Sequence, residues 1–178
     1  MRPPAPPTVP GTLPPRLRDV PRMVWWSERG YVHGIRRGTT AERILSLVLA
    51  LLWWPAYFLS LVVQLVAVGW PASRYYMTLD RDAVIAVIGT NRHCWIVFDH
   101  MSARPGGGSG RDLRRAVLAM LCEAADERGI VIQTIAANGR LAEFYRTDLP
   151  GLSFVGKALP RGKRMRREPD RVQGSANL

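Results

Sequence analysis

The chain has 178 residues, a length typical of one domain rather than several. Lys and Arg number 25 against 14 Asp and Glu, a net charge of +11, so anionic partners are expected: nucleic acid, acidic lipid headgroups or a phosphorylated cofactor. The only two cysteines, Cys94 and Cys122, lie far apart and lack metal-ligand spacing. This excludes a disulfide framework and a zinc site, and it fits a reduced compartment.

The N-terminal region is rich in proline. Eight of the first 21 residues are proline, which fixes φ and removes a backbone donor, so residues 1–21 are expected to form an extended, disordered arm. In residues 22–43, Trp25 and Trp26 lie among several arginines. This composition leaves two alternatives open, a segment at a membrane–water interface or a linker with a short strand.

A long apolar run follows. From Ile44 to Trp70 there are 27 residues without a charged side chain. About 20 apolar residues are enough to cross a bilayer, so the run predicts a membrane segment over residues 44–70. Pro55 near its middle leaves two topologies open, a single kinked span or a re-entrant hairpin bent at Trp54 and Pro55. The arginines that precede the run favour a cytosolic N-terminus.

Beyond the run, apolar periodicity predicts a globular α/β domain in which strands and helices follow one another. Short apolar runs bounded by turn residues predict strands, and three- and four-residue spacing predicts helices. The predicted order is strand 83–88, strand 94–101, a glycine loop, helix 111–128 ended by Gly129, strand 130–137, helix 138–150 and strand 152–159.

The loop between the second strand and the first helix contains Gly106, Gly107, Gly108 and Gly110. Glycine lets the backbone approach a ligand closely, and the free N–H groups and dipole of a helix N-terminus favour an anion such as a pyrophosphate. No Lys-Ser/Thr pair follows the glycines, which excludes a P-loop. The spacing and the lack of a later acidic partner argue against a dinucleotide site.

This arrangement resembles the acyl-CoA loop of the GNAT acetyltransferase family, whose signature is Gln/Arg-x-x-Gly-x-Gly/Ala. Gly108 and Gly110 match the signature, whereas Pro105 stands where Gln or Arg is expected and Arg104 comes one residue early. The resemblance implies a GNAT-like α/β fold over residues 75–159, a mixed sheet with flanking helices, limited to the cofactor-binding half of the family.

A second motif is similar to the same family. Asn138 and Tyr145 are seven residues apart, as in the family's pattern of a strand, an Asn and a helix that ends in Tyr. Leu141 stands where that pattern has Ala. The family's first strand and its two acceptor-side helices are not recognisable, and the apolar run occupies their place.

The resemblance implies acetyl-CoA or another acyl-CoA as co-substrate, no metal, and an N-acyltransferase activity with an unidentified acceptor. Tyr145 would be the general acid, and Asp99 or His100 the base. The cofactor-binding residues would be His100, Met101, Arg104, Gly106, Gly107, Gly108, Ser109, Gly110, Arg111, Asn138 and Tyr145. Because acyl-CoA is a cytosolic metabolite, the domain is expected on the cytosolic face of a membrane.

Residues 160–178 form a basic tail that is expected to be disordered. Anionic lipid and nucleic acid are alternative partners for it, beside a solvated tail with no partner. Three functions therefore stay open: a membrane-associated N-acyltransferase, a non-catalytic GNAT-like binding or anchoring module, and a small basic membrane protein that binds nucleic acid.

Overall fold

The computed structural model describes residues 3–27, 40–104, 108–136, 139–158 and 162–170. Residues 20–27 are helical. The other elements, in chain order, are η1 (Leu17–Asp19), α2 (Thr40–Gly69), β1 (Ser73–Met77), β2 (Ala83–Asn91), β3 (Cys94–Ser102), α3 (Ser109–Arg128), β4 (Val131–Ala136), α4 (Gly139–Asp148), β5 (Ser153–Lys157) and β6 (Lys163–Arg167).

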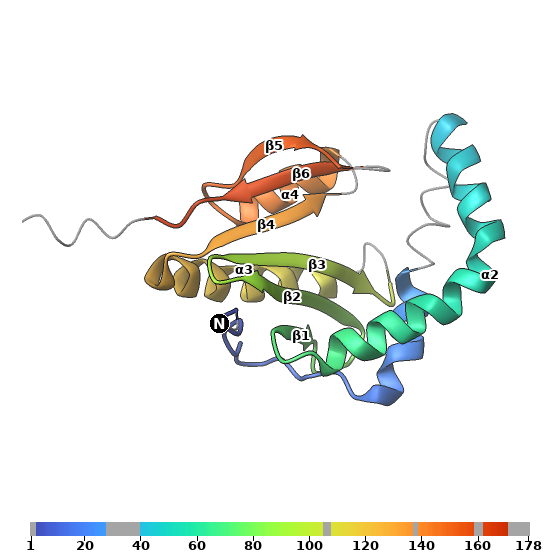
Figure 1. Ribbon diagram of the computed structural model, residues 1–178, viewed down its shortest axis with the longest axis horizontal. Helices are drawn as coiled ribbons and strands as arrows, with labels where there is room; N and C mark the ends of the chain where they lie inside the picture. The colour runs from blue at the N-terminus through green and yellow to red at the C-terminus, as the bar shows by residue number, and fades with distance from the viewer. Residues whose placement is uncertain (1–2, 28–39, 105–107, 137–138, 159–161, 171–178) are drawn as a thin grey trace, which may run out of the picture.

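The strands form one six-stranded mixed sheet in the order β1-β2-β3-β4-β6-β5 (Figure 1). All neighbouring strands are antiparallel except β3 and β4, which are parallel and joined through α3. A parallel pair needs such a crossover, because its strands start at the same edge of the sheet. The predicted mixed sheet with flanking helices is confirmed.

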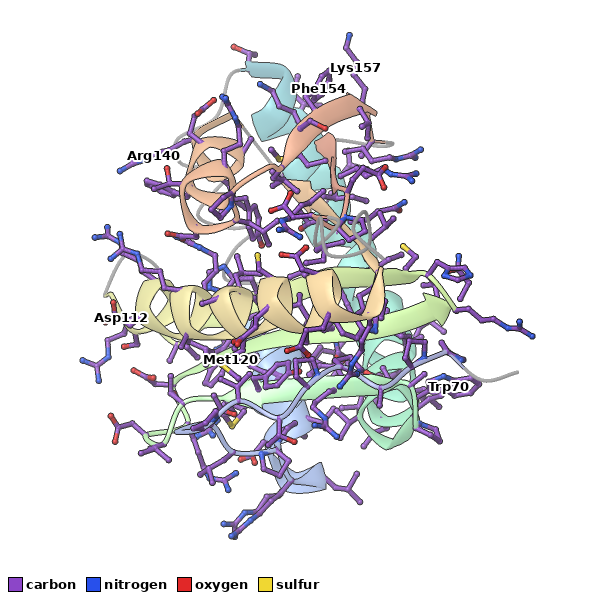
Figure 2. The ribbon with its side chains drawn as sticks, turned by 90° about the vertical axis from the view of Figure 1, so that its left-hand side faces the viewer. Trp70, Asp112, Met120, Arg140, Phe154 and Lys157 are labelled. Carbon is purple, nitrogen blue, oxygen red and sulfur yellow. The ribbon has the colours of Figure 1, made fainter. Side chains whose placement is uncertain are left out.

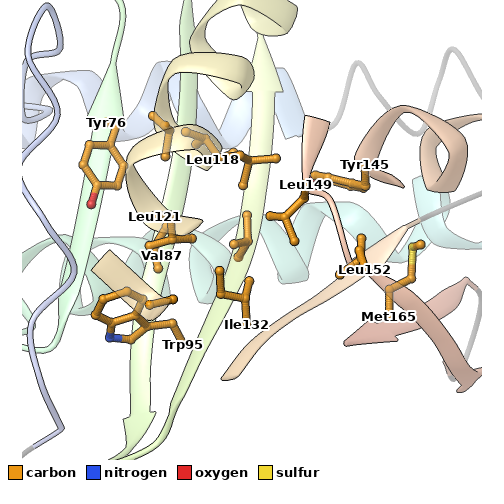
Figure 3. Packing of buried hydrophobic residues seen from close by; sticks show 14 of the residues in the cluster. Tyr76, Val87, Trp95, Leu118, Leu121, Ile132, Tyr145, Leu149, Leu152 and Met165 are labelled. Atoms are coloured by element: carbon orange, nitrogen blue, oxygen red, sulfur yellow. The ribbon is translucent and has the colours of Figure 1, made fainter. Parts of the chain in front are cut away.

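Helix α3 covers one face of the sheet and carries the main core. Its apolar residues recur at three- and four-residue spacing, so one stripe is buried against the strands. Gly129 ends the helix at φ 64°, a left-handed conformation that glycine adopts without strain. In Figure 3, Leu118 and Leu121 of α3 lie among side chains from the strands, which include Tyr76, Val87, Trp95 and Ile132.

The opposite face of β1–β3 is covered by the N-terminal helices. Met23 and Trp26, from the helical residues 20–27, are buried against Tyr75 of β1, with Ala67 and Val68 of α2 packed beside them. Trp26 is therefore a core residue of a helix. Residues 22–27 are therefore helical and do not form a strand, whereas residues 28–39 of the segment expected over residues 22–43 lie outside the described residues.

The proline-rich arm packs on the domain as far as it is described, instead of standing free of it. Leu13 exchanges two backbone hydrogen bonds of 2.9 Å with Met77 of β1. The carbonyls of Pro4 and Pro7 accept hydrogen bonds from Trp95 Nε1 and the Tyr76 hydroxyl. Proline keeps its carbonyl as an acceptor and is suited to extended backbone, so the arm's composition favours this edge contact.

Helix α2 runs without interruption through Pro55, so the chain does not form the hairpin bent at Trp54 and Pro55, which was one of the two topologies left open. Figure 1 shows the helix changing direction part-way along its length, as expected for a helix that contains proline. The Gln64 side chain accepts a hydrogen bond from the Tyr75 hydroxyl, which ties the C-terminal half of α2 to β1. Across the described ranges, no helix combines the length and the hydropathy of a membrane span, and the predicted membrane segment is not supported.

The start of the basic tail is the strand β6, at the position where a disordered tail was expected. Met165 and Arg167 are buried, and the neighbouring Lys163, Arg164 and Arg166 are more accessible. The Arg167 guanidinium, 3% exposed, donates to both carboxylate oxygens of Asp126 in α3 at 2.7 and 2.8 Å. A buried arginine is tolerated in a strand because a carboxylate on the covering helix neutralises it.

Candidate active site

The site is built where β3 and β4 separate. Their parallel ladder covers Cys94–Val97 and Val131–Thr134 only. Beyond it β3 pairs with β2 alone and β4 with β6 alone, in the part of the sheet that the structure describes, and the two strands diverge (Figure 1). At His100 and Met101 the backbone of β3 therefore makes no hydrogen bonds to β4. Its groups on that side can pair with an extended ligand instead.

The N-terminus of α3 lies just beyond the end of β3, at the edge marked by Asp112 in Figure 2. The capping residue is Gly108, with φ 96° and no side-chain cap hydrogen bond. The first N–H groups of a helix lack intrahelical partners, so an uncapped N-terminus is suited to an anion. Arg104 and Arg111 are exposed on either side of this turn.

The two glycines of the motif that are described have different structural roles. A Cβ on Gly108 would meet nothing within 4 Å, so this glycine is needed for its positive φ. A Cβ on Gly110 would lie 3.1 Å from His100 Nε2, so this glycine is needed for the close approach of the histidine ring. Gly106, Gly107 and Asn138, also predicted to bind the cofactor, lie outside the described residues.

His100 supports this turn from below. Its Nε2 donates a hydrogen bond to the Gly110 carbonyl at 2.8 Å, which leaves Nδ1 as the acceptor nitrogen of the neutral ring. Burial lowers the pKa of His100 below its usual value, so the ring is neutral at pH 7. The side chain of Asp99, the alternative predicted base, lies outside the described part of the structure.

The turn between β1 and β2 holds the start of α3 from the other side. Asp82 accepts a hydrogen bond of 2.9 Å from the Ser109 hydroxyl and one of 2.8 Å from the Thr78 hydroxyl. The hydrogen bonds from Thr78 and Ser109 lower the pKa of Asp82, and the nearby charge of Arg104 adds to the effect. Asp82 and Thr78 were not predicted as site residues, because nothing in the sequence relates this turn to the glycine loop.

Tyr145 lies on the inner side of α4, packed against the core (Figure 3). Burial raises the pKa of its phenol, an effect that the nearby Arg114 and Thr134 only partly offset, so the hydroxyl is protonated at neutral pH. Thr134 donates a hydrogen bond to the carbonyl of Val97, the last β3 residue paired with β4. Tyr145 therefore lies near the point where the two strands separate.

A buried ion pair connects Tyr145 with His100. Arg114 of α3 contacts Asp148 of α4 at 2.6 Å, and both side chains are buried. The Arg114 guanidinium lies 5.7 Å from the centre of the Tyr145 ring, and the charges of Arg114 and Asp148 act on the pKa of both His100 and Tyr145. The charges of this one ion pair therefore act on two predicted site residues. The sequence analysis did not identify the pair.

Comparisons with known proteins identify the fold. No protein-family model matches the chain, and no curated protein matches it. Solved structures do: a Streptococcus agalactiae acetyltransferase is similar with a TM-score of 0.52 and 11% identity, over 88% of this chain and 95% of that one. A Corynebacterium glutamicum protein described as histone acetyltransferase HPA2 and related acetyltransferase gives 0.50 and 13%, over 92% and 98%. A Thermus thermophilus acetyltransferase gives 0.50 and 15%, over 88% and 95%.

The chain has the fold of these solved acetyltransferases, a GNAT-like mixed sheet with flanking helices. The likeness covers most of the chain, so the prediction that it is limited to the cofactor-binding half over residues 75–159 is not confirmed. The unrecognised N-terminal part contributes the arm along β1, the helical residues 20–27 and α2. Their packing partners on the sheet lie far along the chain, so local sequence patterns did not reveal them.

Proposed function

We propose that this protein is an acyl-CoA-dependent N-acyltransferase, and that acetyl-CoA is the first co-substrate to test. The observation that carries the proposal is the separation of β3 and β4 beside an uncapped helix N-terminus, within a GNAT fold. The helix N-terminus would bind the pyrophosphate of acyl-CoA, and the unpaired backbone of β3 would bind its pantetheine arm.

The residues present fit such a ligand. Backbone N–H groups at Gly108, Ser109 and Gly110 would hold the pyrophosphate, with Arg104 and Arg111 adding positive charge. The unpaired β3 backbone at His100 and Met101 would pair with the pantetheine arm. Pro105 replaces the Gln or Arg of the family signature, so in this proposal Arg104 and Arg111 supply the charge near the loop.

Acyl-CoA supplies an acyl group already activated as a thioester. The chemistry left to the protein is proton transfer, since an amine N–C bond forms while the C–S bond breaks. Tyr145, kept protonated by burial, would donate its proton to the departing thiolate. The proton lost by the amine would pass to Asp99 or to His100. In His100 the accepting atom would be Nδ1, because Nε2 donates a hydrogen bond to the Gly110 carbonyl.

The location of the enzyme is part of the proposal. Acyl-CoA is a cytosolic metabolite, so we place the site on the cytosolic side of a membrane to which the chain attaches. The acceptor is an amine of unidentified structure.

A second function is favoured by the surroundings of the two proposed proton-transfer groups. His100 Nε2 is bonded to the Gly110 carbonyl, and the Tyr145 side chain is buried in the core. A module that binds acyl-CoA without turnover would use the same fold and the same loop.

Two measurements separate these functions. Calorimetry with acetyl-CoA and with CoA tests cofactor binding; absence of binding by folded protein would remove both functions. Release of free thiol from acetyl-CoA, followed with a panel of polyamines, lysine peptides and amino sugars, then tests turnover. Binding with no thiol release above the buffer rate, for every amine in the panel, favours the binding module.

A further inference from the structure

The most exposed apolar surface of the described chain lies on α2. Ten apolar residues form it, and we call it the outer face: Ile44, Leu47, Val48, Leu51, Phe58, Leu59, Val62, Val63, Leu65 and Val66. At 3.6 residues per turn, these positions fall within an arc of about 160°. Leu51 is 75% exposed and Phe58 is 63% exposed, although both are large apolar side chains. Contiguous apolar patches of this kind are rare on monomeric proteins and mark a binding surface.

The other side of α2 already belongs to the domain. Gln64 is bonded to Tyr75, and Ala67 and Val68 pack against the cluster that contains Met23 and Trp26. The described residues on this side are partly buried: Tyr57, Ser60, Leu61, Gln64, Ala67 and Val68. One face of the helix therefore packs on the protein, and the opposite, apolar face is available to a binding partner, as in an amphipathic helix at a surface.

The chemistry of the outer face points to lipid. Within its arc the described side chains are apolar except for Thr40 at the first position of the helix, whereas protein interfaces carry a polar rim and about one hydrogen bond per 100–200 Å². Acyl chains need no hydrogen-bonding partner. A second copy of the chain, which is the alternative occupant, would meet the outer face with no polar group to fix its orientation.

The neighbouring segments match a membrane surface. Trp70, at the end of α2 (Figure 2), is 53% exposed, and Trp25 is 51% exposed. The segment that packs beside α2 exposes the basic residues Arg16, Arg18 and Arg22, of which Arg22 is paired with Asp19 at 3.2 Å. Indole rings favour the boundary between headgroups and acyl chains, and each unpaired arginine near an anionic surface contributes about 1 kcal/mol of attraction.

We propose that α2 is a lipid-binding helix that lies in the plane of an anionic membrane surface. Its outer face enters the boundary between headgroups and acyl chains, while its inner side remains packed on β1. The exposed arginines at positions 16, 18 and 22 contact the headgroups. This inference does not depend on acyl transfer.

Flotation of the full-length protein with vesicles tests the inference. The protein is mixed with vesicles of phosphatidylcholine, or of phosphatidylcholine and phosphatidylglycerol, and spun through a density gradient. We expect it to float with the anionic vesicles and to remain bound in high salt once inserted, because the main contact is apolar. Leu51→Gln with Phe58→Gln should lower the partition coefficient at least tenfold, or about 1.4 kcal/mol.

The matched control is Ile135→Gln, which changes an apolar residue of β4 that is 53% exposed. It should float like the unchanged protein, and cooperative thermal unfolding reports that each variant is folded. The inference is overturned if the unchanged protein stays at the bottom with both kinds of vesicle, or if the double variant floats equally well. It is also overturned if light scattering finds a lipid-free dimer that the double variant splits, since a second copy then covers the face. Acetyl-CoA binding measured on the same samples tests the proposed function separately.

Discussion

The imidazole of His100 and the carbonyl of Gly110 are joined by a 2.8 Å hydrogen bond between the end of β3 and the first turn of α3. The bond connects the strand proposed to hold the pantetheine with the turn proposed to hold the pyrophosphate. The position of the turn therefore depends on a buried histidine and on the lack of a side chain at residue 110.

Replacing Gly110 with alanine tests this dependence. The added Cβ would lie 3.1 Å from His100 Nε2, so the ring or the turn must shift. In a shifted turn the backbone N–H groups no longer point together at the pyrophosphate. We therefore expect the Kd for acetyl-CoA, measured by calorimetry, to rise about tenfold.

Gly139→Ala is the matched control, because Gly139 also begins a helix but its Cβ would meet only the mobile end of Lys163, at 3.7 Å. It should leave the Kd unchanged. Equal affinity in the Gly110→Ala protein would remove the turn from the cofactor site.

The second prediction concerns pH and follows from the lowered pKa of His100. Burial disfavours the charged ring, so the folded state binds a proton less readily than the unfolded state, whose reference pKa is 6.5. Stability from the neutral ring is complete above that pH and is lost as the pH falls below it. We expect the thermal midpoint to fall between about pH 7 and pH 5.5, and to fall less in His100→Gln.

His93→Gln serves as the control for this experiment, because His93 is an exposed histidine in the turn between β2 and β3. Its pH profile should follow that of the unchanged protein. If His100→Gln shows the full pH dependence as well, the loss of stability arises elsewhere.

The third prediction concerns the pair of Asp126 and Arg167. Asp126→Asn leaves the buried guanidinium with only the exposed carboxylate of Asp170, at 3.1 Å, so we expect the free energy of unfolding to fall by about 3 kcal/mol in denaturant titrations. The control Glu143→Gln removes an exposed ion pair with Arg146 and should cost about 0.5 kcal/mol or less. Similar losses in the two variants would show that the β6 pair is no stronger than a surface pair.

The elements of the domain in which apolar residues recur at regular spacing could be predicted from the sequence. The stripe of α3, the β-branched residues of β4 and the turn at Gly129 all depend on neighbours within a few residues. Strand β6 could not be predicted, because the burial of Arg167 depends on its pair with Asp126, which lies 41 residues earlier in the chain. The arm was missed for the same reason, since Pro4 and Pro7 gain their hydrogen bonds from Trp95 and Tyr76.

The candidate site was predicted in part. The glycine motif and Tyr145 have a spacing that can be recognised in one sequence, but the residues that hold them do not. Asp82 supports Ser109 across a turn, and Arg114 reaches Tyr145 from another helix. Such partners are set by the packing of α3 between two segments that are remote in sequence.

The last prediction tests catalysis through Tyr145→Phe. The substitution removes only the hydroxyl, so the ring still fills its place in the core beside Leu149 (Figure 3). If the hydroxyl protonates the departing thiolate, kcat for thiol release should fall on the order of a hundredfold while the Kd for acetyl-CoA stays the same. The loss of this buried hydroxyl should cost about 1 kcal/mol of stability. Tyr76→Phe is the control, because it removes another buried hydroxyl, bonded to Pro7. It should lower stability by a similar amount and leave kcat unchanged. An equal fall of kcat in both variants would assign the effect to stability and exclude Tyr145 as the general acid.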